Sequence, residues 1–127
     1  MAPVIWYSKR QTTVESSTFG SEFVALRIAT ELIISLCYKL RMFGVKIDGP
    51  ANVFCDNEAV YKNSSNHESQ LKKKHNLICY HKVRELCAAG IIYLFKEGSD
   101  TNLADILTKA LDSGKRLSLR SMIMLDE

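Results

Sequence analysis

The stretch Ala51-Asn52-Val53-Phe54-Cys55-Asp56-Asn57 joins a short apolar run to two polar residues at its carboxyl end. The apolar run predicts a strand, and Asp56 with Asn57 can cap a short helix that continues through Lys62. In open α/β sheets, ligands bind outside the carboxyl ends of the strands. The pattern therefore leaves two explanations for Asp56, helix capping and ligand binding.

Working outward from this stretch, apolar patterns of strand and helix type alternate along the chain. In chain order, the expected elements are a strand at Val4–Tyr7, a helix at about Phe19–Phe43, a strand at Ala51–Cys55, a short helix to Lys62, a helix at Leu71–Ala89, a strand at Ile91–Phe95 and a helix at about Asn102–Leu111. Gly44 and Gly90 are suitable helix stops. The alternation indicates an α/β layered domain with a parallel part.

Length and composition describe an ordinary globular chain. Its 127 residues suffice for one domain, and 46% apolar and 24% charged residues are typical of soluble proteins. A net charge of +3 does not by itself indicate nucleic acid. The four cysteines, Cys37, Cys55, Cys79 and Cys87, lie in apolar segments without CxxC spacing and predict buried free thiols. With no signal peptide and no membrane-length apolar run, the sequence predicts an intracellular, cytoplasmic protein without a membrane partner.

Three acids, Glu22, Asp56 and Asp105, stand at strand ends or helix starts. We expect Glu22 and Asp105 in the first turns of their helices, where the helix dipole alone could explain an acid. Together, the three carboxylates can converge at one edge of the sheet, and two divalent metals need several oxygen ligands held close together. The sequence therefore predicts that these acids are the catalytic and metal-binding residues of a metal-dependent nuclease.

Basic residues follow the predicted mobile loop at 63–70. Lys72, Lys73 and Lys74, with Lys82 and Arg84 on the following turns, form a basic surface. A solvated helix start would also explain these residues, but beside a carboxylate cluster they suit a phosphate backbone. The histidines His67, His75 and His81 with Cys79 match no standard zinc spacing.

Several short motifs occur in an order that points to a known family. They are Ser8-Lys9-Arg10-Gln11, Ser17-Thr18 before Glu22-Phe23-Val24-Ala25-Leu26, Cys55-Asp56-Asn57, Lys74-His75, His81 with Arg84-Glu85, and Ala104-Asp105-Ile106-Leu107-Thr108-Lys109. From about Ile5 to Leu111 the chain resembles the ribonuclease H domain of copia-type retrotransposon polyproteins. The Ala104–Lys109 segment and the Asp-Asn pair are the most specific parts of the resemblance.

This resemblance implies a ribonuclease H-like fold, with a mixed five-stranded sheet and helices on both faces. It implies two-metal hydrolysis, with Mg²⁺ or Mn²⁺, of the RNA strand of an RNA–DNA hybrid, leaving a 3′-hydroxyl and a 5′-phosphate. Glu22, Asp56 and Asp105 correspond to the second, third and fourth family carboxylates, and Lys74-His75 matches a Lys-His pair of the family. The sequence does not assign a role to that pair, and His75 is grouped with the basic residues as a candidate for nucleic-acid binding. The implied partners are the hybrid and an upstream reverse transcriptase part, and the implied locations include virus-like particles and the nucleus.

The sequence departs from the family at its amino end, where we expect the first two strands and the first metal-binding aspartate to be absent. The expectation is one partial ribonuclease H-like domain over residues 1–127, with a core at about 4–111, a C-terminal tail at 112–127 and impaired activity. The Val4–Tyr7 strand would lack its family neighbour, and the Phe19–Phe43 helix would expose part of its apolar face.

Two other functions stay open. One is a catalytically inactive remnant that binds nucleic acid weakly. The other is an unrelated α/β ligand-binding module, which the lack of a Gly-rich phosphate loop disfavours.

Overall fold

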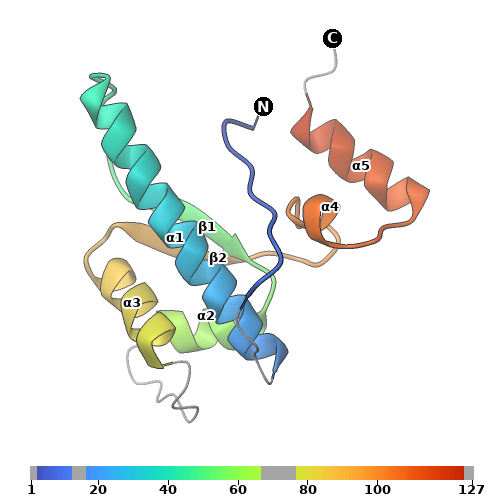
Figure 1. Ribbon diagram of the computed structural model, residues 1–127, viewed down its shortest axis with the longest axis horizontal. Helices are drawn as coiled ribbons and strands as arrows, with labels where there is room; N and C mark the ends of the chain where they lie inside the picture. The colour runs from blue at the N-terminus through green and yellow to red at the C-terminus, as the bar shows by residue number, and fades with distance from the viewer. Residues whose placement is uncertain (1–2, 13–16, 67–76, 125–127) are drawn as a thin grey trace. The chain divides into compact units, whose positions relative to one another are not determined.

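The computed structural model describes residues 3–12, 17–66 and 77–124 (Figure 1). In these ranges the chain is a mixed α/β protein with five helices and a two-stranded parallel sheet. Its contacts fall into two compact units. The central unit comprises Val14–Lys96, and the terminal unit combines Met1–Thr13 with Glu97–Glu127. The prediction of a single domain stays a prediction.

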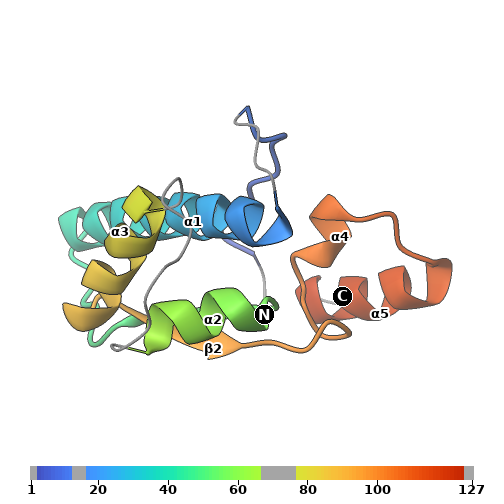
Figure 2. The same ribbon diagram turned by 90° about the horizontal axis from the view of Figure 1, so that it is seen from below.

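The central unit is a β-α-α-β crossover preceded by a long helix. Its elements are α1 (Thr18–Met42), β1 (Ala51–Cys55), α2 (Glu58–Ser65), α3 (Leu77–Ala88) and β2 (Ile92–Lys96). β1 and β2 pair in parallel with Ala51 opposite Ile92 and Cys55 opposite Lys96. Because side chains alternate along a strand, one face carries Val53 and Ile92 while the other carries Phe54 and Phe95. Figure 2 shows α1, α2 and α3 on one side of β2.

The core of the central unit lies between these helices and the sheet. Its buried members come from all five elements: Phe23, Leu26, Val53, Val60, Tyr80, Val83, Leu86 and Ile92. The buried members from α1 lie in its N-terminal half, and Ile33 also packs against the core. Leu32, on the apolar face expected for this helix, is 38% exposed. The expected exposure of part of the apolar face of α1 is therefore confirmed.

The opposite face of the sheet is apolar and uncovered in the described part of the central unit. The rings of Phe54 and Phe95 stack with centroids 5.6 Å apart, and both side chains are exposed. The resemblance implied helices on both faces of a larger sheet. The described residues show two strands covered on one face, and the complete ribonuclease H-like fold stays a prediction.

The terminal unit contains α4 (Asp105–Thr108) and α5 (Ser113–Ile123), together with residues 3–12. The Ser8 hydroxyl donates a hydrogen bond to the Leu107 carbonyl oxygen at 2.9 Å, which links the two segments. α5 begins at an Asp112 cap whose carboxylate accepts from the Lys115 backbone N–H at 3.1 Å. Leu119 is fully buried, whereas Leu117 and Met122 on the same helix are exposed.

Two sequence expectations in this unit were wrong. Val4–Tyr7 forms no strand and its side chains are exposed, because no described strand of the unit supplies the hydrogen-bond partners that a strand needs. The helix expected at about Asn102–Leu111 is reduced to the four residues of α4. The Asn102 side chain accepts from the Ala104 N–H at 3.1 Å and stabilises a turn in place of the first helical residues.

Other differences concern helix ends and cysteines. α2 ends at Ser65 beyond the expected Lys62, and the tail forms the unpredicted helix α5. The four cysteines are free, as expected, but they are half-buried. No helix among the described ranges is long and apolar enough to cross a membrane.

Replacing Phe23 with alanine should lower the free energy of unfolding by about 3–5 kcal/mol, because this fully buried ring would leave a cavity. Urea denaturation followed by circular dichroism measures the change. Phe43, at the end of the same helix, is 83% exposed, and Phe43→Ala should change the free energy by about 0.5 kcal/mol or less. Equal losses in the two variants would contradict the assigned core.

Candidate functional site

Glu22 lies in the second turn of α1. The helix begins at Thr18, Ser17 caps it by accepting the Gly20 N–H at 3.3 Å, and its first turn holds no acid. The prediction that Glu22 lies in the first turn was therefore wrong, because the helix already begins at Thr18. A helix dipole acts mainly on the first turn, so it explains Glu22 less well than the sequence suggested.

Asp56 lies between the end of β1 and the cap of α2. The cap is Asn57, whose Oδ1 accepts the backbone N–H groups of Ala59 at 3.0 Å and Val60 at 3.1 Å. Of the two capping candidates in the sequence, Asn57 therefore has this role. Asp56 precedes this cap at the carboxyl end of β1.

The charges of Glu22 and Asp56 both affect the pKa of the Cys55 thiol. Its pKa is raised, first by burial and further by the negative charges of Glu22 and Asp56. A hydrogen bond from Sγ to the Asn57 carbonyl oxygen at 3.7 Å opposes the increase in pKa. Because both carboxylates act on the same sulfur, the structure places Glu22 and Asp56 within electrostatic reach of one point at the end of β1.

Asp105 has a different environment. It is the first residue of α4 and is 2% exposed. Its Oδ1 accepts from Lys109 Nζ at 2.8 Å and from Asn102 Nδ2 at 3.3 Å, while Lys115 Nζ lies 3.8 Å from Oδ2. A buried carboxylate requires such partners, because burial removes its hydration. These ion pairs explain an acid at this position better than the dipole of a four-residue helix does.

The donor chemistry fits a hard divalent cation in the central unit. Glu22 and Asp56 offer carboxylate oxygens, which Mg²⁺ and Mn²⁺ prefer, and the raised pKa of Cys55 keeps this softer ligand protonated. Asp105 belongs to the terminal unit, and both of its oxygens contact lysine ammonium groups. No group of three or more His, Cys, Asp or Glu side chains in residues 3–12, 17–66 and 77–124 is placed to hold a metal. The joint site of all three acids stays a prediction.

The predicted basic surface lies partly on α3. Lys72, Lys73, Lys74 and His75 are outside the described residues. Lys82 lies 4.0 Å from Glu85, and Arg84 is half-buried. The Arg84 guanidinium donates to the Tyr80 hydroxyl at 2.6 Å and lies 5.1 Å from the centre of the Tyr80 ring. Arg84 is therefore held in place against an aromatic ring, whereas a solvated helix start would leave it free to move.

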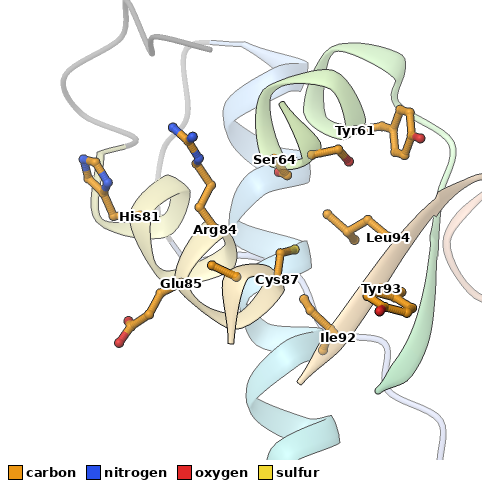
Figure 3. Close-up of a pocket in the computed structure, with 11 residues that line it drawn as sticks. Tyr61, Ser64, His81, Arg84, Glu85, Cys87, Ile92, Tyr93 and Leu94 are labelled. Atoms are coloured by element: carbon orange, nitrogen blue, oxygen red, sulfur yellow. The ribbon is translucent and has the colours of Figure 1, made fainter. Parts of the chain in front are cut away.

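A cavity of about 650 Å³ lies between α2, α3 and β2 (Figure 3). It is lined by Tyr61, Ser64, Ser65, His81, Arg84, Glu85, Cys87, Ala88, Ile92, Tyr93 and Leu94. The Ser64 hydroxyl is buried and has no hydrogen-bond partner among the described residues. Burial also raises the pKa of the Cys87 thiol, which lines the same cavity. This cavity could not be predicted from the sequence, because its wall combines three elements that are separated along the chain.

Sequence reasoning also missed the lysine partners of Asp105. Lys109 follows Asp105 by four residues, a spacing that brings oppositely charged side chains together on a helix and could have been recognised. Lys115 carries no such signal, because it reaches Asp105 across the turn between α4 and α5.

Most of the chain is similar to parts of known polyproteins. Two retrovirus-related Pol polyproteins from Arabidopsis thaliana, of transposons RE1 and RE2, are 28% and 27% identical over 109 residues, or 86% of this chain. The Pol polyprotein of transposon TNT 1-94 from Nicotiana tabacum is 29% identical over 112 residues, or 88% of the chain. The chain is similar to segments of retrotransposon Pol polyproteins.

This similarity covers only 7% to 8% of each polyprotein. No protein-family model and no solved structure matches the chain. The relatives therefore support a retrotransposon polyprotein segment, and the activity of the segment requires its own argument.

Removing the charge of Glu22 should lower the pKa of Cys55, since that charge contributes to raising it. At a fixed pH below the pKa, Glu22→Gln should therefore contain more thiolate and react faster with iodoacetamide at Cys55. Mass spectrometry of the alkylated peptides measures the rate. Glu31→Gln, on the same helix and paired with Arg27, is the matched control and should react like the unmodified chain. A rate unchanged by Glu22→Gln would show that the two groups are not neighbours.

Proposed function

We propose that the chain is the ribonuclease H segment of a retrotransposon polyprotein and hydrolyses the RNA strand of RNA–DNA hybrids. The observation that carries this proposal is the pair of carboxylates at the end of β1. Asp56 lies between the end of β1 and the Asn57 cap of α2, and its charge and that of Glu22 both act on Cys55. Similarity to Pol polyproteins over most of the chain and the ordered ribonuclease H-like motifs support the same assignment.

Glu22, Asp56 and Asp105 are the proposed ligands of Mg²⁺ or Mn²⁺. When bound, a pair of such ions would activate water and stabilise the leaving oxygen of a phosphodiester. Glu22 and Asp56 contribute carboxylate oxygens, the type of ligand that these hard cations prefer. The described residues do not assemble three such ligands into one group, so we expect weak metal binding and slow hydrolysis.

The hybrid and the remaining polyprotein are the proposed partners. Arg84, held against Tyr80, and Lys82 provide described positive charges on α3, and Lys72, Lys73, Lys74 and His75 are proposed to extend them. Because the similar proteins are Pol polyproteins of which the chain spans a small part, an upstream reverse transcriptase part is the proposed neighbour. An intracellular location is part of the same proposal.

A second function has one specific observation in its favour. Lys109 and Lys115 neutralise Asp105, as expected in a chain that binds nucleic acid without cleaving it. Such a module would bind hybrid through its lysines and arginines, and its affinity would fall steeply with salt as counterions are released. Cleavage, and not binding, therefore separates the two functions.

With Mn²⁺ and a labelled RNA–DNA hybrid, the chain should slowly release RNA fragments with 5′-phosphate ends, and Asp56→Asn should abolish the release. Gel electrophoresis of the labelled RNA measures the rate. Asp48→Asn removes an exposed carboxylate that pairs with Lys46 at 3.1 Å, and this control should cleave at the unmodified rate. Equal cleavage by Asp56→Asn would exclude the proposed site, and salt-sensitive binding without any cleavage would establish the second function.

A further inference from the structure

The helix α5 carries Lys115, whose ammonium group lies near Asp105. Lys115 lies in the first turn of α5, where Asp112 accepts its backbone N–H. The Lys115 side chain is only 27% exposed, unlike the other lysines that pair with acids at the surface. Residues 113–123 therefore form a folded element that fixes the position of this ammonium group.

The ammonium group of Lys115 lies among three oxygen atoms. It donates to the Ser99 carbonyl oxygen at 2.8 Å and lies 3.8 Å from both Asp100 Oδ1 and Asp105 Oδ2. Lys109 approaches Asp105 from the other side, with Nζ 2.8 Å from Oδ1. Each oxygen of the buried Asp105 carboxylate thus has its own ammonium neighbour.

A divalent cation and these ammonium groups need the same oxygen atoms. Magnesium or manganese would lie closer to a carboxylate oxygen than an ammonium does, and like charges at such separations repel strongly in a partly buried setting. A cation can therefore reach Asp105 fully only when at least one ammonium group withdraws. Lys109 is about half exposed and withdraws into solvent easily, whereas Lys115 is held by Ser99 and by α5.

We propose that Lys115 is an intramolecular competitor of the divalent cation at Asp105, so that docking of α5 weakens metal binding. This inference rests on the proposed role of Asp105 as a metal ligand and adds a regulatory contact to it. Lys115 lies beyond the stretch from Ile5 to Leu111 that carries the family resemblance, so the contact belongs to the tail of this chain. Displacement of α5, by a substrate or by the rest of a polyprotein, would release Asp105 for the metal.

The test is the affinity of the full chain for Mn²⁺, measured by water proton relaxation, in the unmodified protein and in Lys115→Met. The variant should bind Mn²⁺ about three- to fivefold more tightly, as expected for the loss of one partly exposed competing charge. Lys115→Arg keeps the charge and should bind like the unmodified chain. Arg116→Met removes the same charge from the next, exposed position of α5 and should leave the affinity unchanged.

Tighter binding is a result that mere loss of structure would not produce, because a loosened site binds metal less well. Lys109→Met removes the second ammonium group without altering α5, and it should shift the affinity in the same direction. Unchanged or weaker binding in both lysine variants would overturn the competition. Asp105→Asn then separates this inference from the proposed function. If Asp105→Asn weakens Mn²⁺ binding although the lysine variants do not strengthen it, the proposed function stands. An unaltered affinity in Asp105→Asn would show that Asp105 is not a metal ligand.

Discussion

Burial of Phe23, Val83 and Ile92 against one face of the β1–β2 pair is the constraint on which the central unit depends. Two parallel strands alone bury too little surface to be stable, so the helices on that face hold them in register. The packing also fixes where β1 ends. Phe23 belongs to the core, and its neighbour Glu22 is held near Cys55 at the end of β1, where Asp56 follows. The proposed chemistry therefore depends on an apolar core next to the acids.

Much of this unit could be predicted from the sequence because its signals are local. The helical period of α1, the apolar runs of β1 and β2 and the glycine stop at Gly90, where φ is 66°, each act within a few residues. Val4–Tyr7 shows the limit of that reasoning. Its composition favours a strand, but a strand requires a partner at the right distance, and the described residues offer none to this segment.

The candidate site, too, was predictable only in part from the sequence. The sequence identified Glu22, Asp56 and Asp105 as acids of interest, but for each of them it also allowed a local explanation, a helix cap or a helix dipole. The structure distinguishes the three acids by their neighbours. Some of these neighbours are distant in sequence, and in one case two adjacent residues were equally suited to the same role. Asn57 takes the capping role that Asp56 could have had, and Lys115 reaches Asp105 across a turn of no recognisable pattern. Long-range ion pairs of this kind depend on tertiary packing, which a linear pattern does not encode.

The central proposal is that Glu22, Asp56 and Asp105 serve one metal site. Paramagnetic broadening of backbone amide signals by substoichiometric Mn²⁺ measures this directly, because broadening depends steeply on distance from the ion. The account predicts that the amides around residues 22, 56 and 105 broaden together at the lowest Mn²⁺ concentrations. Broadening confined to residues 22 and 56, or centred on other acids of the chain, would contradict a common site.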